Sequence, residues 1–183
     1  MSIEKLKVEY EIDLLWRGFP LHPEIPEEGI PTEALFAGRT VDIEKMRHQM
    51  KEAAALVGLP LEQTGMVYNS RLAQELGFWA ESQKKGDEFH RAVFKAYFVS
   101  GKNIGNIQVL VEIARSVGFP GDDAEDVLTT RAYKPAVDMD WSLARRYNIH
   151  MVPTFVMNNH GLFGMQSYEI LEGFVVARGA RKR

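Results

Sequence analysis

The stretch that decides the fold is Val152-Pro153-Thr154-Phe155-Val156-Met157, followed by Asn158-Asn159-His160-Gly161 and Leu162-Phe163-Gly164. The first run is short, apolar and rich in β-branched side chains, and the second is typical of a tight turn. Together they predict a β-hairpin whose return strand opens with the third run. A last helix is expected from about Ser167, with an apolar side formed by Ile170, Leu171, Phe174 and Val175.

Two segments near the N-terminus have contrasting patterns. Residues 8–17 alternate apolar with mostly charged side chains, which predicts a strand with one strongly apolar face. Residues 18–34 contain four prolines, which disfavour both a helix interior and a central strand. We therefore expect an ordered loop there, packed onto the body through its apolar side chains.

Residues 41–131 are expected to form a helical block, because apolar residues recur at helical spacing between capping residues and glycines. A short helix capped by Asp138 or Asp140 should lie between this block and the hairpin. Strands toward both ends and one helical block between them indicate a single sheet with an inserted cap. We expect an α/β fold, with residues 1–40 and 132–183 in the sheet domain and 41–131 as an inserted all-helical subdomain.

The composition excludes several kinds of chemistry. The chain has 183 residues and no cysteine, so this polypeptide cannot form a disulfide, a thiolate metal site or a dithiol redox centre. Its five histidines lack metal-ligand spacing, and no nucleotide-binding, zinc-protease or nucleophile-elbow motif is present. From these residues we expect neither a bound metal ion nor a cofactor.

Charge and the chain ends bear on partners and location. With 22 basic and 25 acidic residues, the chain is not expected to bind nucleic acid, and no apolar run is long enough to suggest a membrane span. The first residues do not form a signal peptide, so a cytoplasmic location is expected. The basic run Arg178-Gly179-Ala180-Arg181-Lys182-Arg183 is expected to be the frayed end of the last helix.

Several short motifs occur in an order that matches one known family. They are Trp16-Arg17-Gly18-Phe19-Pro20-Leu21-His22-Pro23, Val67-Tyr68-Asn69-Ser70 with Ala73, Phe94-Lys95-Ala96-Tyr97-Phe98 with Gly101, and Gly164-Met165-Gln166-Ser167. The set resembles the DsbA-like thioredoxin-fold disulfide oxidoreductases, and most closely their cytoplasmic FrnE-type branch, although Gly18 replaces the usual proline. The resemblance implies a thioredoxin-like (DsbA-like) sheet and a cis peptide bond before Pro153.

One departure from this family concerns its catalytic segment. The family opens with a central strand that leads into Cys-x-x-Cys at a helix N-terminus, where the helix dipole lowers the thiol pKa. Here Ile3-Glu4-Lys5-Leu6 resemble the last turn of that helix, so the strand and the cysteine pair would lie before residue 1. The resemblance therefore implies a sheet without its first strand, no catalytic residue, and a chain without thiol–disulfide activity.

The resemblance also implies a ligand site and partners. In the family, the backbone before the cis-proline pairs with an extended peptide or with glutathione, and Val152, Pro153 and Thr154 occupy that position here. Gln166 and Ser167 lie at the start of the last helix and are expected to offer N–H groups to a carboxylate. Because a missing strand leaves open sheet edges and an uncovered apolar face, a homo-oligomer is expected as well.

Three functions remain open at this stage. The first is a disulfide oxidoreductase relative that is inactive because its cysteine segment is absent. The second is a relative of the kappa-type glutathione-dependent isomerases and transferases, which share the helical insert and the cis-proline. The third is a non-catalytic module that retains the peptide groove and the helical cap.

Overall fold

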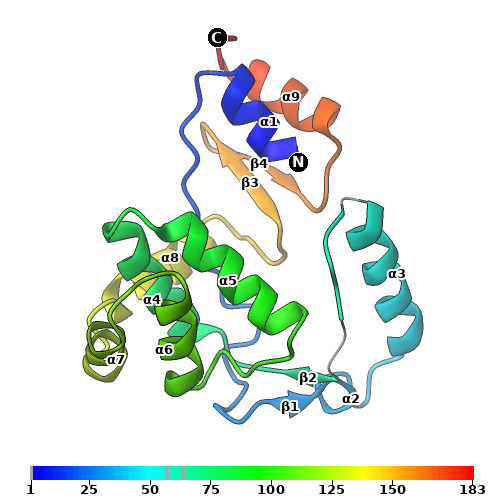
Figure 1. Cartoon of the computed structure of the whole chain (residues 1–183). Coiled ribbons are helices and arrows are strands. Elements are labelled where there is room, and N and C mark those ends of the chain that lie inside the picture. Colours follow the sequence, from blue (N-terminus) through cyan, green and yellow to red (C-terminus); the bar gives the residue numbers. More distant parts are fainter. Residues whose placement is uncertain (1, 57, 63–64) are drawn as a thin grey trace. The chain divides into compact units, whose positions relative to one another are not determined.

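The structure is a computed structural model that describes residues 2–56, 58–62 and 65–183 (Figure 1). Its elements are mostly helices, accompanied by two small sheets. The chain divides into two compact units, which are described separately: unit 1 contains Met1–Leu21 and Asp140–Arg183, and unit 2 contains His22–Met139. In the described ranges, no helix has the length and apolar character that crossing a membrane requires.

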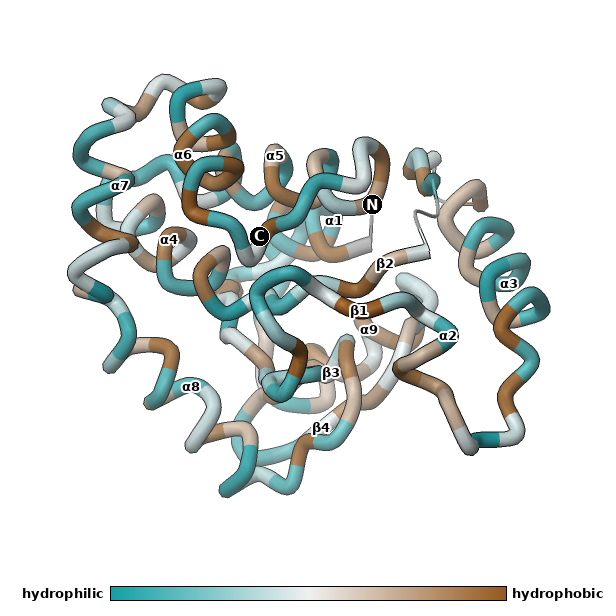
Figure 2. Tube along the Cα trace, turned by 90° about the horizontal axis from the view of Figure 1, so that it is seen from below, coloured by the Kyte–Doolittle hydropathy of each residue, from teal (hydrophilic) through white to brown (hydrophobic). Residues whose placement is uncertain are grey.

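The core of unit 2 lies among four amphipathic helices. These are α4 (Arg71–Ser82), α5 (Gly86–Phe98), α6 (Ile107–Ser116) and α7 (Gly121–Thr130). Figure 2 shows apolar and polar residues alternating along them, as expected for helices with one buried face. The side chains that are fully buried between them include Leu76, Phe89, Leu110 and Leu128. The helices predicted within this region are therefore present.

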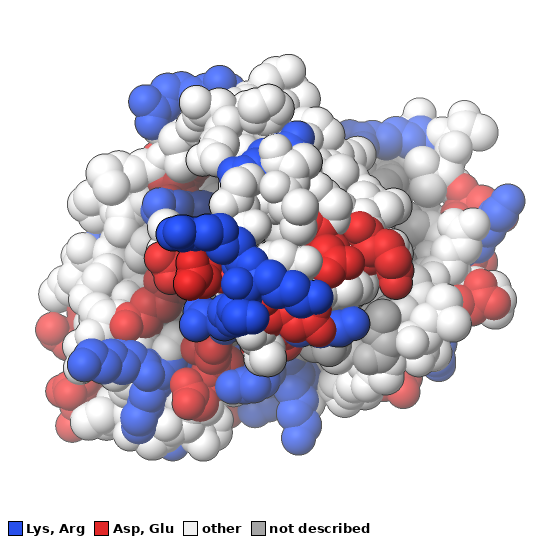
Figure 3. Space-filling model, turned by 90° about the horizontal axis from the view of Figure 1, so that it is seen from above, with Lys and Arg blue, Asp and Glu red and all other residues white. Residues whose placement is uncertain are grey.

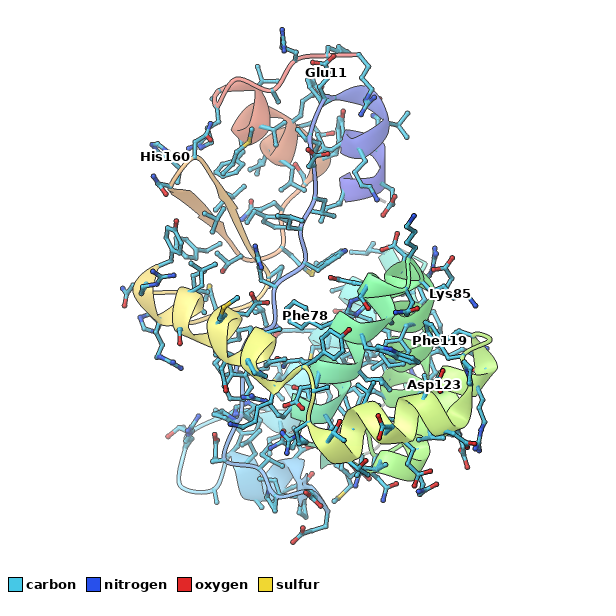
Figure 4. The ribbon with its side chains drawn as sticks, turned by 90° about the vertical axis from the view of Figure 1, so that its left-hand side faces the viewer. Glu11, Phe78, Lys85, Phe119, Asp123 and His160 are labelled. Atoms are coloured by element: carbon cyan, nitrogen blue, oxygen red, sulfur yellow. The ribbon has the colours of Figure 1, made fainter. Side chains whose placement is uncertain are left out.

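The turn that follows α6 in unit 2 is held by the side chain of Lys85. Lys85 lies beside Phe119, with its Nζ 5.1 Å from the ring centroid (Figure 4). The same ammonium donates to the carbonyls of Val117 and Gly118, just past the end of α6. A cation at this position complements the negative end of the helix dipole. The turn between α6 and α7 is thereby tied to the start of α5.

The proline-rich segment is only partly a loop. Within it lie β1 (Ile30–Pro31) and the single-turn helix α2 (Thr32–Leu35), and β1 pairs antiparallel with β2 (Met66–Val67). Pro31 is tolerated because both strands of a two-stranded sheet are edge strands. Gly29 is needed before β1: its φ is +79°, and a Cβ there would lie 2.3 Å from the Tyr68 ring. A further helix, α3 (Ile43–Leu56), has no fully buried residue among those described.

Unit 1 contains a hairpin packed against two helices. Its elements are α1 (Ser2–Glu9), the second part of α8 (Lys134–Arg146), β3 (Thr154–Met157), β4 (His160–Phe163) and α9 (Tyr168–Val176). The buried residues at the centre are Leu6, Tyr10, Leu171, Phe174 and Val175. The side chains of the hairpin that pack against this cluster are Phe155, Met157 and Leu162.

The predicted hairpin and last helix are confirmed, with one shift. Asn158 and Asn159 have φ values of 49° and 64°, which suit a two-residue type I′ turn. The return strand therefore begins at His160, two residues earlier than predicted. Ser167 caps α9 by accepting a hydrogen bond from the Ile170 N–H.

The predicted strand over residues 8–17 is wrong. Helix α1 continues to Glu9, and Tyr10 forms an isolated bridge with Lys182. The alternation predicts burial only for the middle of this face: Tyr10 is buried and Ile12 and Leu14 are partly buried, but Val8 and Trp16 are 74% and 53% exposed. A strand also requires a paired neighbour along its length, and among the described residues this segment forms a β-bridge only at Tyr10. The expected single sheet is accordingly replaced by two separate two-stranded sheets.

The C-terminal residues are ordered against the N-terminal segment, so the expectation of a frayed end is wrong. The Glu11 N–H donates to the Arg181 carbonyl (2.8 Å), and the Arg183 N–H donates to the Glu9 carbonyl (2.9 Å). Arg181 also forms an ion pair with Glu11 (3.3 Å). Figure 3 shows basic side chains lying beside acidic ones on the face that it draws. The basic tail is therefore neutralised in part by neighbouring carboxylates.

Candidate functional site

The candidate site lies where the chain enters β3. The Val152–Pro153 peptide bond is cis, as the resemblance implied. The Gly164 N–H donates to the Pro153 carbonyl (2.8 Å), and the Thr154 hydroxyl donates to the Met151 carbonyl (2.7 Å). These two bonds hold the loop at the open end of the hairpin. His160, labelled in Figure 4, marks the opposite end next to the turn.

The residues before β3 are exposed, with Val152 48% exposed and Met151 51% exposed. In an antiparallel hairpin with a two-residue turn, hydrogen-bonded and non-hydrogen-bonded pairs alternate. Because Met157 and His160 flank the turn, the backbone groups of Val156 and Thr154 point away from β4. No other strand in the described part of the chain pairs with that edge of β3.

Gln166 is joined to the strands through Phe163. Its side-chain amide donates to the Phe163 carbonyl (2.6 Å), and Phe163 is the residue opposite Thr154 in the hairpin. The structure thus brings Pro153, Thr154 and Gln166 together at one end of the hairpin. Whether these residues contact a ligand stays a prediction.

Ser167 is engaged in capping α9 and in a contact with Glu169. The hydrogen bond from the Ser167 hydroxyl, together with the Glu169 backbone N–H, holds the pKa of the Glu169 carboxyl below its usual range. The N-terminus of α9 therefore already has a carboxylate of this chain beside it. The Ser167 hydroxyl therefore has partners within α9, while the expectation that Gln166 and Ser167 offer N–H groups to a ligand stays a prediction.

The sequence analysis missed the role of Asp140. Helix α8 begins at Lys134, so Asp138 and Asp140 lie inside the helix and the prediction that either caps it is wrong. Asp140 is buried and accepts hydrogen bonds from Arg17 Nη1 (3.1 Å) and from the Gly18 N–H (2.7 Å). Its spacing from the buried Val137 and Ala144 was a usable signal, because residues three and four positions apart share a helix face.

Two tyrosines join α1 to α9 in unit 1. The Tyr10 hydroxyl donates to Glu172 (2.7 Å), and the Tyr168 hydroxyl donates to Glu9. The bond to Glu172, burial, and the charges of Glu172 and Glu9 raise the pKa of Tyr10 to about 12. The bond to Glu9 is the largest cause that raises the pKa of Tyr168 as well. Lys5 lies over the Tyr168 ring, 3.9 Å from its centroid.

A buried carboxylate lies inside unit 2. Glu75 is fully buried and accepts hydrogen bonds from Arg131 Nε (2.7 Å) and Nη2 (2.8 Å) and from Arg71 Nε (2.7 Å). Burial alone would raise its pKa, but the bonds from Arg131 and Arg71 outweigh burial and hold the pKa below the usual range. The two guanidinium groups share the single charge of Glu75, and Arg71 also donates to Asp138 (2.7 Å), which favours a structural role for this cluster. Across the described ranges, no group of three or more His, Asp or Glu residues is arranged to hold a metal ion.

Comparison with known sequences places these features in context. The profile of the DSBA-like thioredoxin domain family matches residues 1–176. The uncharacterized protein YwbO of Bacillus subtilis (strain 168) is 32% identical over 104 residues, which cover 55% of this chain and 51% of YwbO. The chain thus spans about half the length of this curated relative.

Solved structures show the same fold. A probable DsbA oxidoreductase from Streptomyces coelicolor matches with a TM-score of 0.84 at 20% identity, covering 92% of this chain and 76% of that one. A 2-hydroxychromene-2-carboxylate isomerase gives a TM-score of 0.62 at 19% identity, covering 75% and 66%. The cytosolic disulfide reductase DsbM from Pseudomonas aeruginosa, described with GSH, gives 0.54 at 18% identity, covering 75% and 76%. At these identities the likeness concerns the fold alone.

Proposed function

Because this chain belongs to the DSBA-like thioredoxin domain family but contains no cysteine, we propose that it binds an extended peptide without thiol–disulfide chemistry. Thiol–disulfide exchange requires a thiolate that attacks a sulfur atom, and this polypeptide can supply none. What supports peptide binding is the exposed loop that enters β3, in which Val152 is 48% exposed next to the cis peptide bond to Pro153. An extended chain can pair with an exposed backbone segment by main-chain hydrogen bonds.

The surroundings of Val152 favour a peptide with apolar side chains. Met151 and Met165 are 51% and 70% exposed on either side of the hairpin's open end. Methionine is flexible and adapts to apolar side chains of different shapes. Gln166 supplies an amide oxygen that can accept a hydrogen bond, since its amide N–H already donates to Phe163. We infer that peptide side chains contact the methionines while its backbone pairs with Val152.

Glutathione is the second candidate ligand. DsbM, whose fold is similar, is described with GSH, and the kappa-type glutathione-dependent alternative would also bind this tripeptide. A tripeptide of γ-glutamyl, cysteinyl and glycyl residues also presents an extended backbone to Val152. In this chain glutathione would not exchange a disulfide with the protein, because no protein thiol meets its sulfur.

The finer placement of the chain is also a proposal. The Trp16–Pro23 motif and its companions favour the FrnE-type branch of the family, and Gly18 is the main departure from that pattern. A cytoplasmic location belongs to the same proposal, because that branch of the family is cytoplasmic. Sequencing upstream of Met1 in the gene would show whether a strand and a Cys-x-x-Cys segment precede this chain in a longer protein.

Two measurements test the proposed function. Insulin reduction by the purified chain should not exceed the chemical background, and turnover above it would overturn the absence of thiol–disulfide activity.

Calorimetric titration should detect binding of an unstructured apolar peptide. Met151→Glu should weaken that binding about tenfold or more, because burying a methionine side chain is worth roughly 1.5–3 kcal/mol. The same titration with reduced glutathione in place of the peptide tests the second candidate ligand, because binding of glutathione but not of the peptide would favour it.

The matched control for this test is Met139→Glu. Met139 is a methionine of α8 in unit 2 with 69% exposure, so the substitution changes charge and apolar surface in the same way outside the loop before β3. Its peptide affinity should equal that of the unsubstituted chain. Equal losses in both variants, or no peptide binding at all, would contradict the assignment of the ligand site to the loop before β3.

A further inference from the structure

We propose that the outer face of α9 binds the same face of a second copy of this chain, with the two helices antiparallel. This outer face consists of Ile170, Gly173, Val176 and Ala177, and all four residues are exposed. Positions separated by three, six and seven residues lie along one side of an α-helix. A Cβ added at Gly173, at the centre of the face, would meet no atom within 4 Å. The face is therefore an open apolar surface.

The opposite side of α9 is already covered. Leu171, Phe174 and Val175 are buried there, in a cluster with residues of α1 and of the hairpin (Figure 1). The outer face is turned away from both of these elements. It is thus separate from the loop before β3, so this inference goes beyond the proposed function and does not depend on it.

The composition of α9 is unusual for a helix with one side in water. Such a helix normally has charged residues on its outward side, whereas a helix that is apolar on all sides is normally buried. Residues 170–177 contain one charged side chain, that of Glu172, which accepts a hydrogen bond from the Tyr10 hydroxyl. Ile170 and Val176 remain 51% and 48% exposed on either side of Gly173. A second apolar surface would remove both side chains from water.

The charges at the two ends of α9 favour a second copy as the partner. Glu169 is exposed in the first turn, and Arg178, Arg181, Lys182 and Arg183 follow the helix. Antiparallel pairing brings Glu169 of each copy toward the basic end of the other, whereas parallel pairing would bring like charges together. Antiparallel pairing also sets the two helix dipoles in opposite directions. The outer face of α9 is therefore complementary to itself.

Gly173 determines the register of the two helices. Two helices approach each other most closely where a glycine leaves room for the backbone of the other. A two-fold axis beside Gly173 sets Ile170 of one copy opposite Val176 of the other, because both lie three positions from the glycine. Each copy then contributes the same residues, as a closed two-fold interface requires.

The first test measures mass in solution by light scattering after size exclusion. The unsubstituted chain should have twice the mass of the 20.8 kDa monomer, and Val176→Glu should reduce it to the monomer. The matched control is Val8→Glu, the same substitution at a valine of α1 that is 74% exposed. It should remain a dimer. A monomeric unsubstituted chain, or equal dissociation by both substitutions, would overturn the proposal.

The second test examines the orientation of the helices. Glu169→Lys should raise the dissociation constant of the dimer about threefold or more, because it replaces attraction to the basic end of the other copy by repulsion at two places. The control is Glu4→Lys, which makes the same change at an exposed glutamate of α1 and should leave the dissociation constant nearly unchanged. An unchanged constant for Glu169→Lys would contradict antiparallel pairing and overturn the proposal.

The third test determines the register, and it uses the lack of cysteine in the natural chain. Oxidised Ile170→Cys/Val176→Cys protein should run as a cross-linked dimer on a non-reducing gel, because the two positions would lie opposite each other. Each single variant should stay uncross-linked, since its two thiols would be about 9 Å apart along the helices. Far-ultraviolet circular dichroism checks that each variant folds. A folded dimer that the double variant fails to cross-link would place the interface elsewhere and overturn the proposal.

Discussion

Asp140 accepts a hydrogen bond from the backbone N–H of Gly18, with 2.7 Å between Oδ2 and N, although 122 positions separate the two residues. The other carboxylate oxygen accepts a bond from the Arg17 guanidinium at 3.1 Å. Only 2% of the Asp140 side chain is exposed, against 51% of that of Arg17. The carboxylate therefore fixes the segment around Gly18 to α8 within unit 1.

Replacing this carboxylate should destabilise unit 1. Asp140→Ala leaves the Gly18 N–H without its acceptor beside a buried cavity, and a buried donor that loses its partner costs about 1–3 kcal/mol. Chemical denaturation at neutral pH should show a loss of at least this size. Arg17→Ala removes only the half-exposed partner, and exposed ion pairs contribute about 1 kcal/mol or less. Equal losses for both substitutions would contradict the view that the bond to Gly18 carries most of the stabilisation.

The buried Glu75 should produce an acid-sensitive contribution to stability. Its pKa is lower in the folded state, so its contribution is complete above its ordinary pKa of 4.5 and is lost as the pH falls through the folded value. Glu75→Gln should cost about 3–5 kcal/mol at neutral pH, because two arginines lose their charged partner. The difference between the variant and the unsubstituted chain, measured by denaturation across pH, should shrink on acidification.

A matched comparison for Glu75 is Asp138→Asn. Asp138 also bonds to Arg71 (2.7 Å), but 49% of its side chain is exposed. The substitution should therefore cost much less than Glu75→Gln, because water can replace the lost bond. If both substitutions lower the free energy of unfolding by the same amount, the burial of Glu75 does not explain the stabilisation by its ion pairs.

The two tyrosines between α1 and α9 should make the chain sensitive to alkaline pH. Tyr10 has a pKa raised to about 12, above its ordinary value of 10.0, and that of Tyr168 is raised too. Their contribution is therefore complete below pH 10 and is lost as the pH rises through the folded values. In Tyr10→Phe/Tyr168→Phe the free energy of unfolding should be lower at neutral pH and should fall less between pH 10 and 12.

The control for the tyrosine pair is Tyr147→Phe, which removes an exposed hydroxyl that bonds to Asn159. It should leave the alkaline decline in stability unchanged. Phenolate absorbance gives an independent readout, since Tyr10→Phe should remove the contribution of one tyrosine to the late-titrating signal near pH 12 and leave that of Tyr168. An unchanged signal there would show that the bond to Glu172 does not hold the proton on Tyr10.

The sequence predicted correctly those elements whose structure depends on interactions between residues close together in the chain. The hairpin was predictable because Thr154 and Val156 favour strands and the asparagine pair favours a turn. Residues 8–17 show the limit of the same reasoning. Alternation correctly indicated that Tyr10 and Ile12 face inward, but whether an extended segment becomes a strand depends on a neighbour that the pattern does not describe.

The sequence likewise predicted some features of the candidate site and missed others. The resemblance implied the cis bond before Pro153 and open sheet edges, but not that residues 8–17 lie outside the sheet, because strand pairing is not encoded in any one segment. The mistaken cap at Asp140 has a comparable cause. Where α8 begins depends on the preceding turn, in which Arg131 ends α7 with a left-handed φ of 56°. The ligand roles of Val152, Pro153, Thr154, Gln166 and Ser167 stay predictions.

The turn of the hairpin offers a prediction that separates backbone from side-chain effects. Asn159 has a φ of 64°, which glycine adopts freely and alanine does not. Asn159→Ala should therefore lower the free energy of unfolding by about 1–2 kcal/mol, whereas Asn159→Gly should be neutral or slightly stabilising. Both variants also lose the bond from the Tyr147 hydroxyl, which Tyr147→Phe removes alone. Equal losses in the alanine and glycine variants, matched by Tyr147→Phe, would assign the effect to that bond and not to the turn.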